Sequence, residues 1–253
     1  MSIILTSASF YGSLVVLDGR TASVLQFLAL DGRRVDGMAP PQPQHPRLTS
    51  KKVMTVIVYD VRKGHSAPFH RYQAHSTLYW ESHFTIHGLW PELEDGPHPG
   101  FCTKEPLDIN IVRSAIGEDT LEKYWPNVKV AANTTHYDSF WGHEWSRHGT
   151  CSGLDQVGFF QSAIDKIKAQ GTPAFVTQHV GQSVSTKDVR DAFGGAGQAV
   201  LKCEHGNELS QVFTCYDKDA SSNVPTTLRA CSAHVLAEDT CKSTATVVIR
   251  GFK

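Results

Sequence analysis

The sequence carries almost no net charge, because 24 Lys and Arg residues nearly balance 25 Asp and Glu residues. It therefore lacks a broad basic surface for following phosphates, and a nucleic-acid partner would have to be bound locally, in a cleft. It also lacks an evident internal repeat and an apolar run long enough to cross a membrane. With 40% hydrophobic and 19% charged residues, the 253-residue chain is typical of one sizeable globular domain with an extension, or of two small domains.

Cys-x-x-Cys pairs are absent, which argues against a zinc ribbon and against a thioredoxin-type redox site. The even number of cysteines favours three disulfides and an oxidising compartment; these residues are Cys102, Cys151, Cys203, Cys215, Cys231 and Cys241. The sequon at Asn133 predicts N-glycosylation and agrees weakly with secretion. We therefore expect a secreted protein, or a lysosomal or vacuolar one.

The beginning of the sequence lacks the features of an ordinary signal peptide. Residues 1–17 are apolar, but no Lys or Arg precedes them and no clear small-x-small cleavage site follows. They indicate an atypical leader, or a start that differs from that of the mature protein. Residues 39–47 are rich in proline and predict a semi-rigid linker. We accordingly divide the chain into an N-terminal extension or leader at 1–48 and a main domain at 49–253.

Hydrophobic periodicity and turn residues predict both strands and helices in the main domain. Strands are expected at 53–61, 83–87, 199–203, 209–216 and 246–249, and the third and fourth of these should form a hairpin. Helices are expected at 109–124, at 185–193, and between a cap at Asp155 and a stop at Gly171. Residues 64–81 are polar and rich in histidine, so we expect a loop there.

One expected strand carries a candidate catalytic histidine. In the segment 83–87, alternation places the apolar side chains on one face and His87 on the other. Gly88 and Pro91 are expected to end the strand and to present His87 away from the core. A histidine at such a position is more often structural than catalytic, so this segment alone decides nothing.

The stretch Phe140–Cys151 concentrates two histidines, a carboxylate and a guanidinium within six positions. A helix turns by about 100° per residue, so four polar side chains would lie within an arc of roughly 140°: His143, Glu144, Arg147 and His148. Trp145 would point the other way and pack. Asp138 or Ser139 could cap such a helix, and Gly149 suits the position just after its end.

Two other interpretations of this stretch are open. A His-Glu pair with a later histidine resembles a zinc protease, but that signature needs two histidines four positions apart. His143 and His148 are five apart and would diverge on a helix. The four residues could also be ordinary surface side chains, an explanation that weakens when they coincide beside two tryptophans and a cysteine.

Histidines and a carboxylate can catalyse acid–base chemistry without a metal. Two imidazoles with ordinary pKa values of about 6.5 can act as one general base and one general acid at mildly acidic to neutral pH. Neither Ser nor Cys is placed as an evident nucleophile, so the nucleophile should belong to the substrate. RNA carries one in the 2′-hydroxyl beside each phosphodiester, and cationic side chains would stabilise the charge that develops there.

The segments His87–Glu92 and Phe140–Cys151 together resemble the two active-site segments of the ribonuclease T2 family. The likeness extends from about residue 53 to the C-terminus and includes Tyr124-Trp125-Pro126 and residues 159–163. The resemblance implies an α+β fold with an antiparallel central sheet flanked by helices. It also implies metal-independent cleavage of single-stranded RNA through a 2′,3′-cyclic phosphate to 3′-phosphate ends, with low base specificity.

The same resemblance implies a role for each motif residue. His148 resembles the general base and His87 the general acid, and Glu144 would support the charge of His148 and the transition state. Phosphate would be contacted by His143 and Arg147. The bases would be bound by Trp90, Glu92 and Phe140, and aromatic stacking tolerates every base. The implied disulfides are Cys102 with Cys151, Cys203 with Cys241 and Cys215 with Cys231.

Two positions depart from the family pattern. Arg147 stands where the family usually has Lys, which keeps the charge but replaces a compact ammonium with a bulkier planar group. Tyr59-Asp60-Val61-Arg62 stands where Gln-Trp-Pro commonly follows the first strand, and this change concerns the second base site.

These features predict an active, monomeric endoribonuclease that binds single-stranded RNA and uses neither a cofactor nor a metal. The alternative is a catalytically inactive secreted family member that binds RNA, a glycan or a protein. The presence of His87, Glu144 and His148 together favours the enzyme.

Overall fold

The chain divides into two compact units, Met1–Pro43 and Gln44–Lys253, in this computed structural model. The structure describes residues 3–8, 11–18, 21–25, 53–60, 79–96, 98–127, 130 and 134–250. In the first unit, β1 (Ile3–Ala8), β2 (Tyr11–Asp18) and β3 (Thr21–Leu25) form an antiparallel sheet in that order. The expected linker at 39–47, most of the expected loop at 64–81, and Asn133 lie outside the described residues.

The second unit is built on a seven-stranded sheet with the order β5-β4-β8-β10-β6, to which β7 and β9 add by pairing with β8. The described pairings are antiparallel except that of β10 with β8. The predicted α+β class is confirmed. The strands are β4 (Val53–Asp60), β5 (Thr85–Leu93), β6 (Ser183–Ser185), β7 (Ala199–Glu204), β8 (Glu208–Lys218), β9 (Pro225–Arg229) and β10 (Thr246–Val248).

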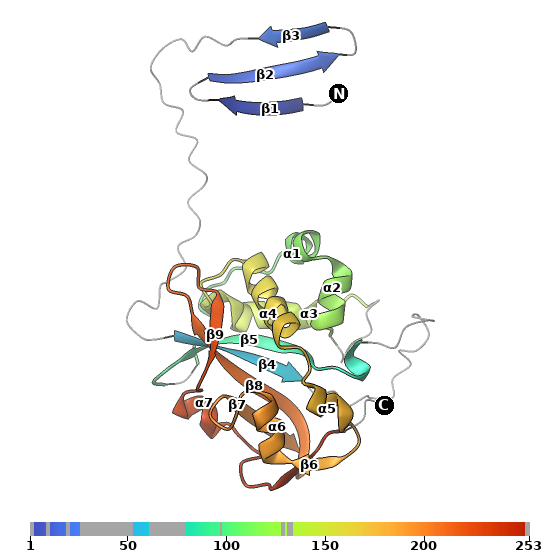
Figure 1. Cartoon of the computed structure of the whole chain (residues 1–253). Coiled ribbons are helices and arrows are strands. Elements are labelled where there is room, and N and C mark those ends of the chain that lie inside the picture. Colours follow the sequence, from blue (N-terminus) through green and yellow to red (C-terminus); the bar gives the residue numbers. More distant parts are fainter. Residues whose placement is uncertain are drawn as a thin grey trace. The chain divides into compact units, whose positions relative to one another are not determined.

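Helices flank this sheet. Figure 1 shows α1 to α4 gathered on one side of β5, and α6 beside β7. Among the described residues, no helix is long and apolar enough to cross a membrane. The α-helices are α1 (Ile109–Ile116), α2 (Glu118–Tyr124), α3 (Ser139–Arg147), α4 (Gln156–Gln170), α5 (Ala174–Gln178), α6 (Thr186–Ala192) and α7 (Ala233–Ala237). Short 3₁₀ turns cover Tyr79–Glu81 and Gly149–Cys151.

Local caps explain where the predicted helices begin and end. α4 begins where the Asp155 carboxylate accepts a hydrogen bond from the Gly158 N–H, and it ends at Gly171, whose φ is 63°. α6 begins after Ser185, whose hydroxyl accepts from the Asp188 N–H. These two helices and the β7–β8 hairpin are present as predicted.

One predicted helix is wrong in its extent. The segment 109–124 forms two helices, α1 and α2, because Gly117 interrupts it with a φ of 90°. That conformation is readily accessible to glycine and breaks the helical ladder.

An aromatic core holds α3 against α4 and the end of α2. Trp125, Trp141, Trp145, Phe159 and Phe160 are all fully buried. The indole N–H of Trp141 donates to the backbone oxygen of Trp125 at 2.8 Å, and that of Trp145 donates to the backbone oxygen of Glu105, between β5 and α1, at 3.0 Å. Burying such rings stabilises the fold by a few kcal/mol each, at about 25 cal/mol per Å² of apolar surface. This packing fixes the orientation of α3.

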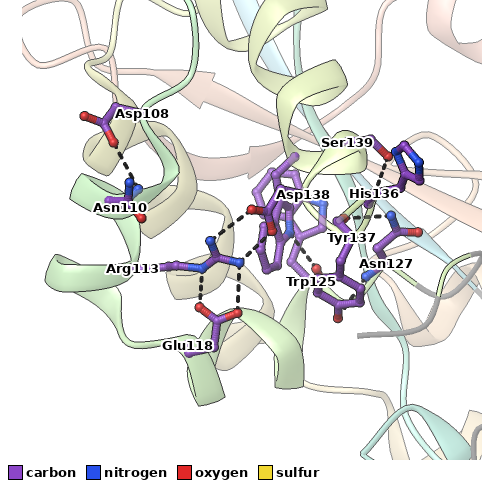
Figure 2. A network of polar contacts seen from close by, with 11 residues as sticks. Asp108, Asn110, Arg113, Glu118, Trp125, Asn127, His136, Tyr137, Asp138 and Ser139 are labelled. Atoms are coloured by element: carbon purple, nitrogen blue, oxygen red, sulfur yellow. Dashed lines mark hydrogen bonds and ion pairs between the residues drawn. The ribbon is translucent and has the colours of Figure 1, made fainter. Parts of the chain in front are cut away.

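A charged network ties the start of α3 to α1 and α2 (Figure 2). Arg113 of α1 donates to both oxygens of Asp138, at 2.9 and 2.6 Å, and to the Glu118 carboxylate. Asp138 occupies the N-cap position of α3, as predicted, but its carboxylate is directed to Arg113 and not to the helix N–H groups. The helix start is therefore held by a tertiary contact.

Three disulfides close loops in the second unit. Cys102 pairs with Cys151, which joins the loop after β5 to the end of α3. The other pairs are Cys203 with Cys241 and Cys215 with Cys231, and together they fasten the C-terminal segment to β7 and β8. These are the pairs that the family resemblance implies.

Candidate active site

His87 lies at a bulge in β5. The β4–β5 register runs from Val53↔Leu93 to Val58↔Gly88, but the next pair is Tyr59↔Ile86, so His87 is the extra residue. A bulge turns a side chain out of the regular alternation, which is how a strand can aim one residue at a site. The prediction that the strand ends after His87 is wrong, because β5 continues to Leu93. β5 is the first strand in the sheet order, and a proline such as Pro91 is tolerated on an edge strand.

The His87 ring is held from several directions. Its Nδ1 is 2.9 Å from Nε2 of Gln211, and with the amide in this orientation the neutral ring accepts at Nδ1 and carries its proton at Nε2. The Trp125 indole donates to the His87 backbone oxygen at 2.9 Å, and the Phe140 ring meets the imidazole edge to face at 5.6 Å. The side chain remains 29% exposed.

Glu144 of α3 lies between His87 and Trp90. One carboxylate oxygen is 3.8 Å from Nε2 of His87, and the other accepts a hydrogen bond from the Trp90 indole at 3.1 Å. The close approach of β5 and α3 depends on Gly88, since a Cβ there would lie 2.2 Å from the Trp90 nitrogen and 2.3 Å from the carboxylate. Glu144 therefore couples the strand to the helix.

His148 follows the last residue of α3 and stacks on Trp90, with ring centroids 4.8 Å apart and an interplanar angle of 16°. The residue is only 3% exposed. Burial, followed by the positive charge of Arg147, lowers the pKa of His148 to about 3. The ring is consequently neutral at neutral and mildly acidic pH, and it can accept a proton. Its Nδ1 is buried without a hydrogen-bond partner among the described residues.

The other two side chains of the predicted polar face, His143 and Arg147, are less buried than Glu144 and His148. His143 is exposed, and partial burial of its ring and the nearby Arg147 lower its pKa. Arg147 places one nitrogen 3.4 Å from Nε2 of His98 and its guanidinium 5.8 Å from the ring centre of Phe101. The four side chains that were predicted to share one face thus form an inner pair, Glu144 and His148, and an outer pair.

Glu92 is a buried carboxyl on the same strand as Trp90. Burial, followed by repulsion from Glu238, raises the pKa of Glu92 to about 8, so the group is protonated at neutral pH. One of its oxygens, Oε2, has no hydrogen-bond partner among the described residues. The His98 ring lies close by, with its Nδ1 4.0 Å from the other oxygen.

The zinc-protease interpretation gains no support from this arrangement. Within the described ranges, the one group of three potential metal ligands contains neither His143 nor His148. His87, Glu144 and His148 instead contact the Trp90 ring, which lies among them.

A model of the ribonuclease T2 family matches residues 66–231, which is more than half of the chain. The chain belongs to the ribonuclease T2 family. The intracellular ribonuclease LX of Solanum lycopersicum is 36% identical over 150 residues, which are 54% of this chain and 62% of that protein. Ribonuclease DdI of Dictyostelium discoideum is 34% identical over 152 residues, which are 55% of this chain and 64% of that protein. The chain thus spans just under two thirds of these relatives.

Solved structures show the same T2 fold. The crystal structure of an RNase MC1 mutant in complex with 5'-UMP matches with a TM-score of 0.55 and 23% identity, over 78% of this chain and 98% of that one. An RNase-related protein from Calystegia sepium matches with a TM-score of 0.56 and 22% identity, over 79% and 97% of the two chains.

Two residues beside the T2 motifs were not predicted from the sequence. Gln211 of β8 contacts His87, and His98 lies between Glu92 and Arg147. Gln211 is 124 positions from His87 and carries no motif, and His98 is one of 13 histidines, so neither offered a local signal. The segment 59–62, which replaces the family's Gln-Trp-Pro, falls at and after the end of β4, and its side chains lie outside the described residues.

Proposed function

We propose that this chain is an endoribonuclease that cleaves single-stranded RNA with low base specificity. The observation that carries the proposal is the convergence of His87, Glu144 and His148 on the Trp90 ring. It supplies two imidazoles and one carboxylate at a single place, contributed by the strand β5 and by the helix α3 with its C-cap residue.

The proposed reaction has two steps. In the first, neutral His148 takes the proton of the 2′-hydroxyl and the 2′-oxygen attacks phosphorus. His87 acts in its protonated, imidazolium form, with the oxygen of the Gln211 amide turned toward Nδ1, and donates its Nε2 proton to the departing 5′-oxygen, which leaves His87 neutral. A 2′,3′-cyclic phosphate results, and the 5′-oxygen leaves without addition of water, which makes this step a phosphorus–oxygen lyase reaction. In the second, water opens the ring with the two histidines in exchanged roles and leaves a 3′-phosphate. Arg147 and His143 are proposed to stabilise the negative charge on the phosphate oxygens, and Glu144 the developing charge on the imidazoles.

Trp90 lies over His148, the proposed general base. Its ring stacks on His148, a residue that is only 3% exposed, and we propose that Trp90 moves to admit the substrate to this imidazole. We propose that Trp90 then stacks on the first nucleobase of the RNA, and that the protonated Glu92 carboxyl donates a hydrogen bond to the same nucleobase. Phe140, which touches His87, is proposed to stack on the second base.

Further aspects of the proposal concern the whole protein. Three disulfides favour an oxidising compartment, and we propose secretion or residence in a lysosome or vacuole. We also propose N-glycosylation at Asn133, action as a monomer without a cofactor, and a division into an extension at 1–48 and a catalytic domain at 49–253.

Cleavage of single-stranded RNA in the presence of EDTA tests the proposed function. We expect 2′,3′-cyclic phosphate ends first and 3′-phosphate ends later, resolved by chromatography of oligonucleotide products. His87→Ala and His148→Ala should each reduce kcat about 10²- to 10⁴-fold, the usual contribution of one acid or base.

His136→Ala is the matched control, because His136 is an exposed histidine just before α3 to which no catalytic or binding role is assigned. It should retain the activity of the unchanged chain. Full RNase activity of either catalytic variant, with folding verified by circular dichroism, would show that the residue roles are wrong. Absence of cleavage by the unchanged protein would remove the enzyme assignment altogether.

A further inference from the structure

We propose that Glu92, His98 and His234 form a binding site for one divalent metal ion of the zinc class, beside the proposed catalytic centre. Each of these residues offers one ligand atom, and the three atoms lie within 4.8 Å of one another. Two imidazoles and one carboxylate are a ligand set that suits zinc and not magnesium or calcium. This ion plays no part in the proposed cleavage.

The second observation is the unsatisfied carboxyl of Glu92. Its side chain is 2% exposed, and Oε2 has no hydrogen-bond partner among the residues that the structure describes. A buried carboxyl with an unpartnered oxygen costs free energy, and a cation bound by this carboxyl would offset part of that cost. The oxygen observed 4.0 Å from Nδ1 of His98 is the other one, Oε1, and a carboxylate can bind a cation through either oxygen or both. The group lies beside two imidazoles that can complete the coordination of such a cation.

Three separate segments hold the ligands near one another. Glu92 is on β5, His98 follows in the loop after that strand, and His234 is in the first turn of α7. The chain just before α7 is fastened to β8 by the disulfide between Cys215 and Cys231. Ligands at about 2.1 Å from a tetrahedral zinc ion are about 3.4 Å apart. A closure of at most about 1.4 Å, which the exposed His234 can make by a side-chain rotation, therefore completes the site.

The surrounding charges act in both directions. Glu238, at the end of α7, repels the Glu92 carboxylate and so adds negative potential that favours a cation, and its ion pair with Lys202, at 3.1 Å, reduces that contribution. Arg147 opposes it, because its guanidinium lies 3.4 Å from Nε2 of His98. Coordination through Nδ1 of His98 leaves Nε2 protonated, so Arg147 must turn away from that ring when the ion binds.

Occupancy of this site would inhibit the enzyme, a consequence that rests on the proposed function. Glu92 cannot both ligate the ion and donate a hydrogen bond to the first base. The displaced Arg147 would also leave the position from which it is proposed to stabilise the phosphate. Zinc should therefore compete with RNA and raise KM more than it lowers kcat.

Zinc binding to the full chain, measured by calorimetry after treatment with EDTA and dialysis, tests the site directly. His98→Ala, His234→Ala and Glu92→Gln should each weaken the tightest zinc site about tenfold or more, as loss of a metal ligand does. Mg²⁺ should give no comparable heat. His136→Ala is the control, because the chain has 13 histidines and some of the others will bind zinc weakly.

Inhibition of RNA cleavage is measured on the same proteins, each relative to its own rate in EDTA. The zinc concentration that halves the cleavage rate should be about ten times higher for His234→Ala than for the unchanged chain, because the variant has lost one zinc ligand. Equal zinc affinity of the His98, His234 and control variants would overturn the site. Zinc binding that depends on these ligands in a protein that cleaves no RNA would keep the site and remove the proposed function. Binding without inhibition of an active enzyme would overturn the inhibitory role.

Discussion

At the residue scale, burial acts in opposite directions on two ionisable groups near Trp90. It lowers the pKa of His148 to about 3 and raises that of Glu92 to about 8. Both groups are consequently neutral at mildly acidic pH, because burial always disfavours the charged form. A neutral imidazole accepts a proton and a neutral carboxyl donates a hydrogen bond, which are the roles proposed for them.

The pKa of His148 predicts the acidic limit of activity. Because the base must be unprotonated, kcat/KM should fall only as the pH decreases through about 3. Arg147 is the second cause of the lowered pKa, so Arg147→Gln should raise it and move the acidic limb to higher pH. The rate at the optimum should also fall. The measurement is kcat/KM for a dinucleotide between pH 2.5 and 7. Circular dichroism at each pH verifies that the protein is folded.

Arg229→Gln provides the control for that shift, since Arg229 pairs with Glu94 and Asp217 and is not a cause of the lowered pKa of His148. It should leave the acidic limb where it is. An unshifted limb in Arg147→Gln would contradict the proposed influence of the guanidinium on His148.

At the element scale, the site depends on how closely β5 approaches α3. Gly88 allows the Trp90 indole and the Glu144 carboxylate to meet directly over the strand, and Gly149 packs against the Trp145 ring, where a Cβ would lie 2.3 Å from a ring atom. These two glycines are needed because another segment occupies the space of a side chain. Their role is steric, and it links the core to the proposed catalytic groups.

Gly88→Ala should therefore destabilise the protein and reduce its activity. The added methyl must displace Trp90 or Glu144, and the overpacking should cost about 1–3 kcal/mol in the free energy of unfolding. Activity should fall further than stability explains, because the Trp90–Glu144 hydrogen bond is broken. Denaturant unfolding and single-stranded RNA cleavage measure the two effects.

Gly142→Ala is the matched control within α3, since a Cβ at Gly142 meets no atom within 4 Å. It should be neutral or stabilising by about 0.5–1 kcal/mol, the helix propensity difference between the two residues. If Gly88→Ala were as stable and as active as this variant, the close approach of β5 and α3 would be unimportant for the site.

At the scale of the whole molecule, the parts required for the proposed catalysis belong to the second unit. The three disulfides, the aromatic core beneath α3 and every proposed catalytic side chain lie within Gln44–Lys253. The family match, at 66–231, falls inside the same unit. The first unit forms its own sheet of three strands.

A chain that begins at Gln44 should consequently fold and cleave RNA with an unchanged kcat. Its disulfides should form as in the full chain, because none of the six cysteines lies before residue 44. The two chains are compared by thermal unfolding and by their kcat and KM on a long single-stranded RNA. A large loss of activity or of cooperative unfolding in the shortened chain would show that the first unit is part of the catalytic domain.

Much of the fold could be predicted because its signals are local. The caps at Asp155 and Ser185, the stop at Gly171 and the hairpin between β7 and β8 depend on residues a few positions apart. The division at Gly117 was missed for a related reason, since hydrophobic periodicity continues across a glycine that turns the backbone. The two motifs likewise indicated the chemistry and the family, because each is a short continuous segment.

The sequence by itself therefore determined which residue types are available and in which local elements they lie. The tertiary structure alone decided the bulge that aims His87, the Arg113 network that holds α3, and the contacts of Gln211 and His98. These contacts join residues 25 to 124 positions apart. Such distances are closed only by the packing of strands and helices around a common core, and no local periodicity encodes that packing.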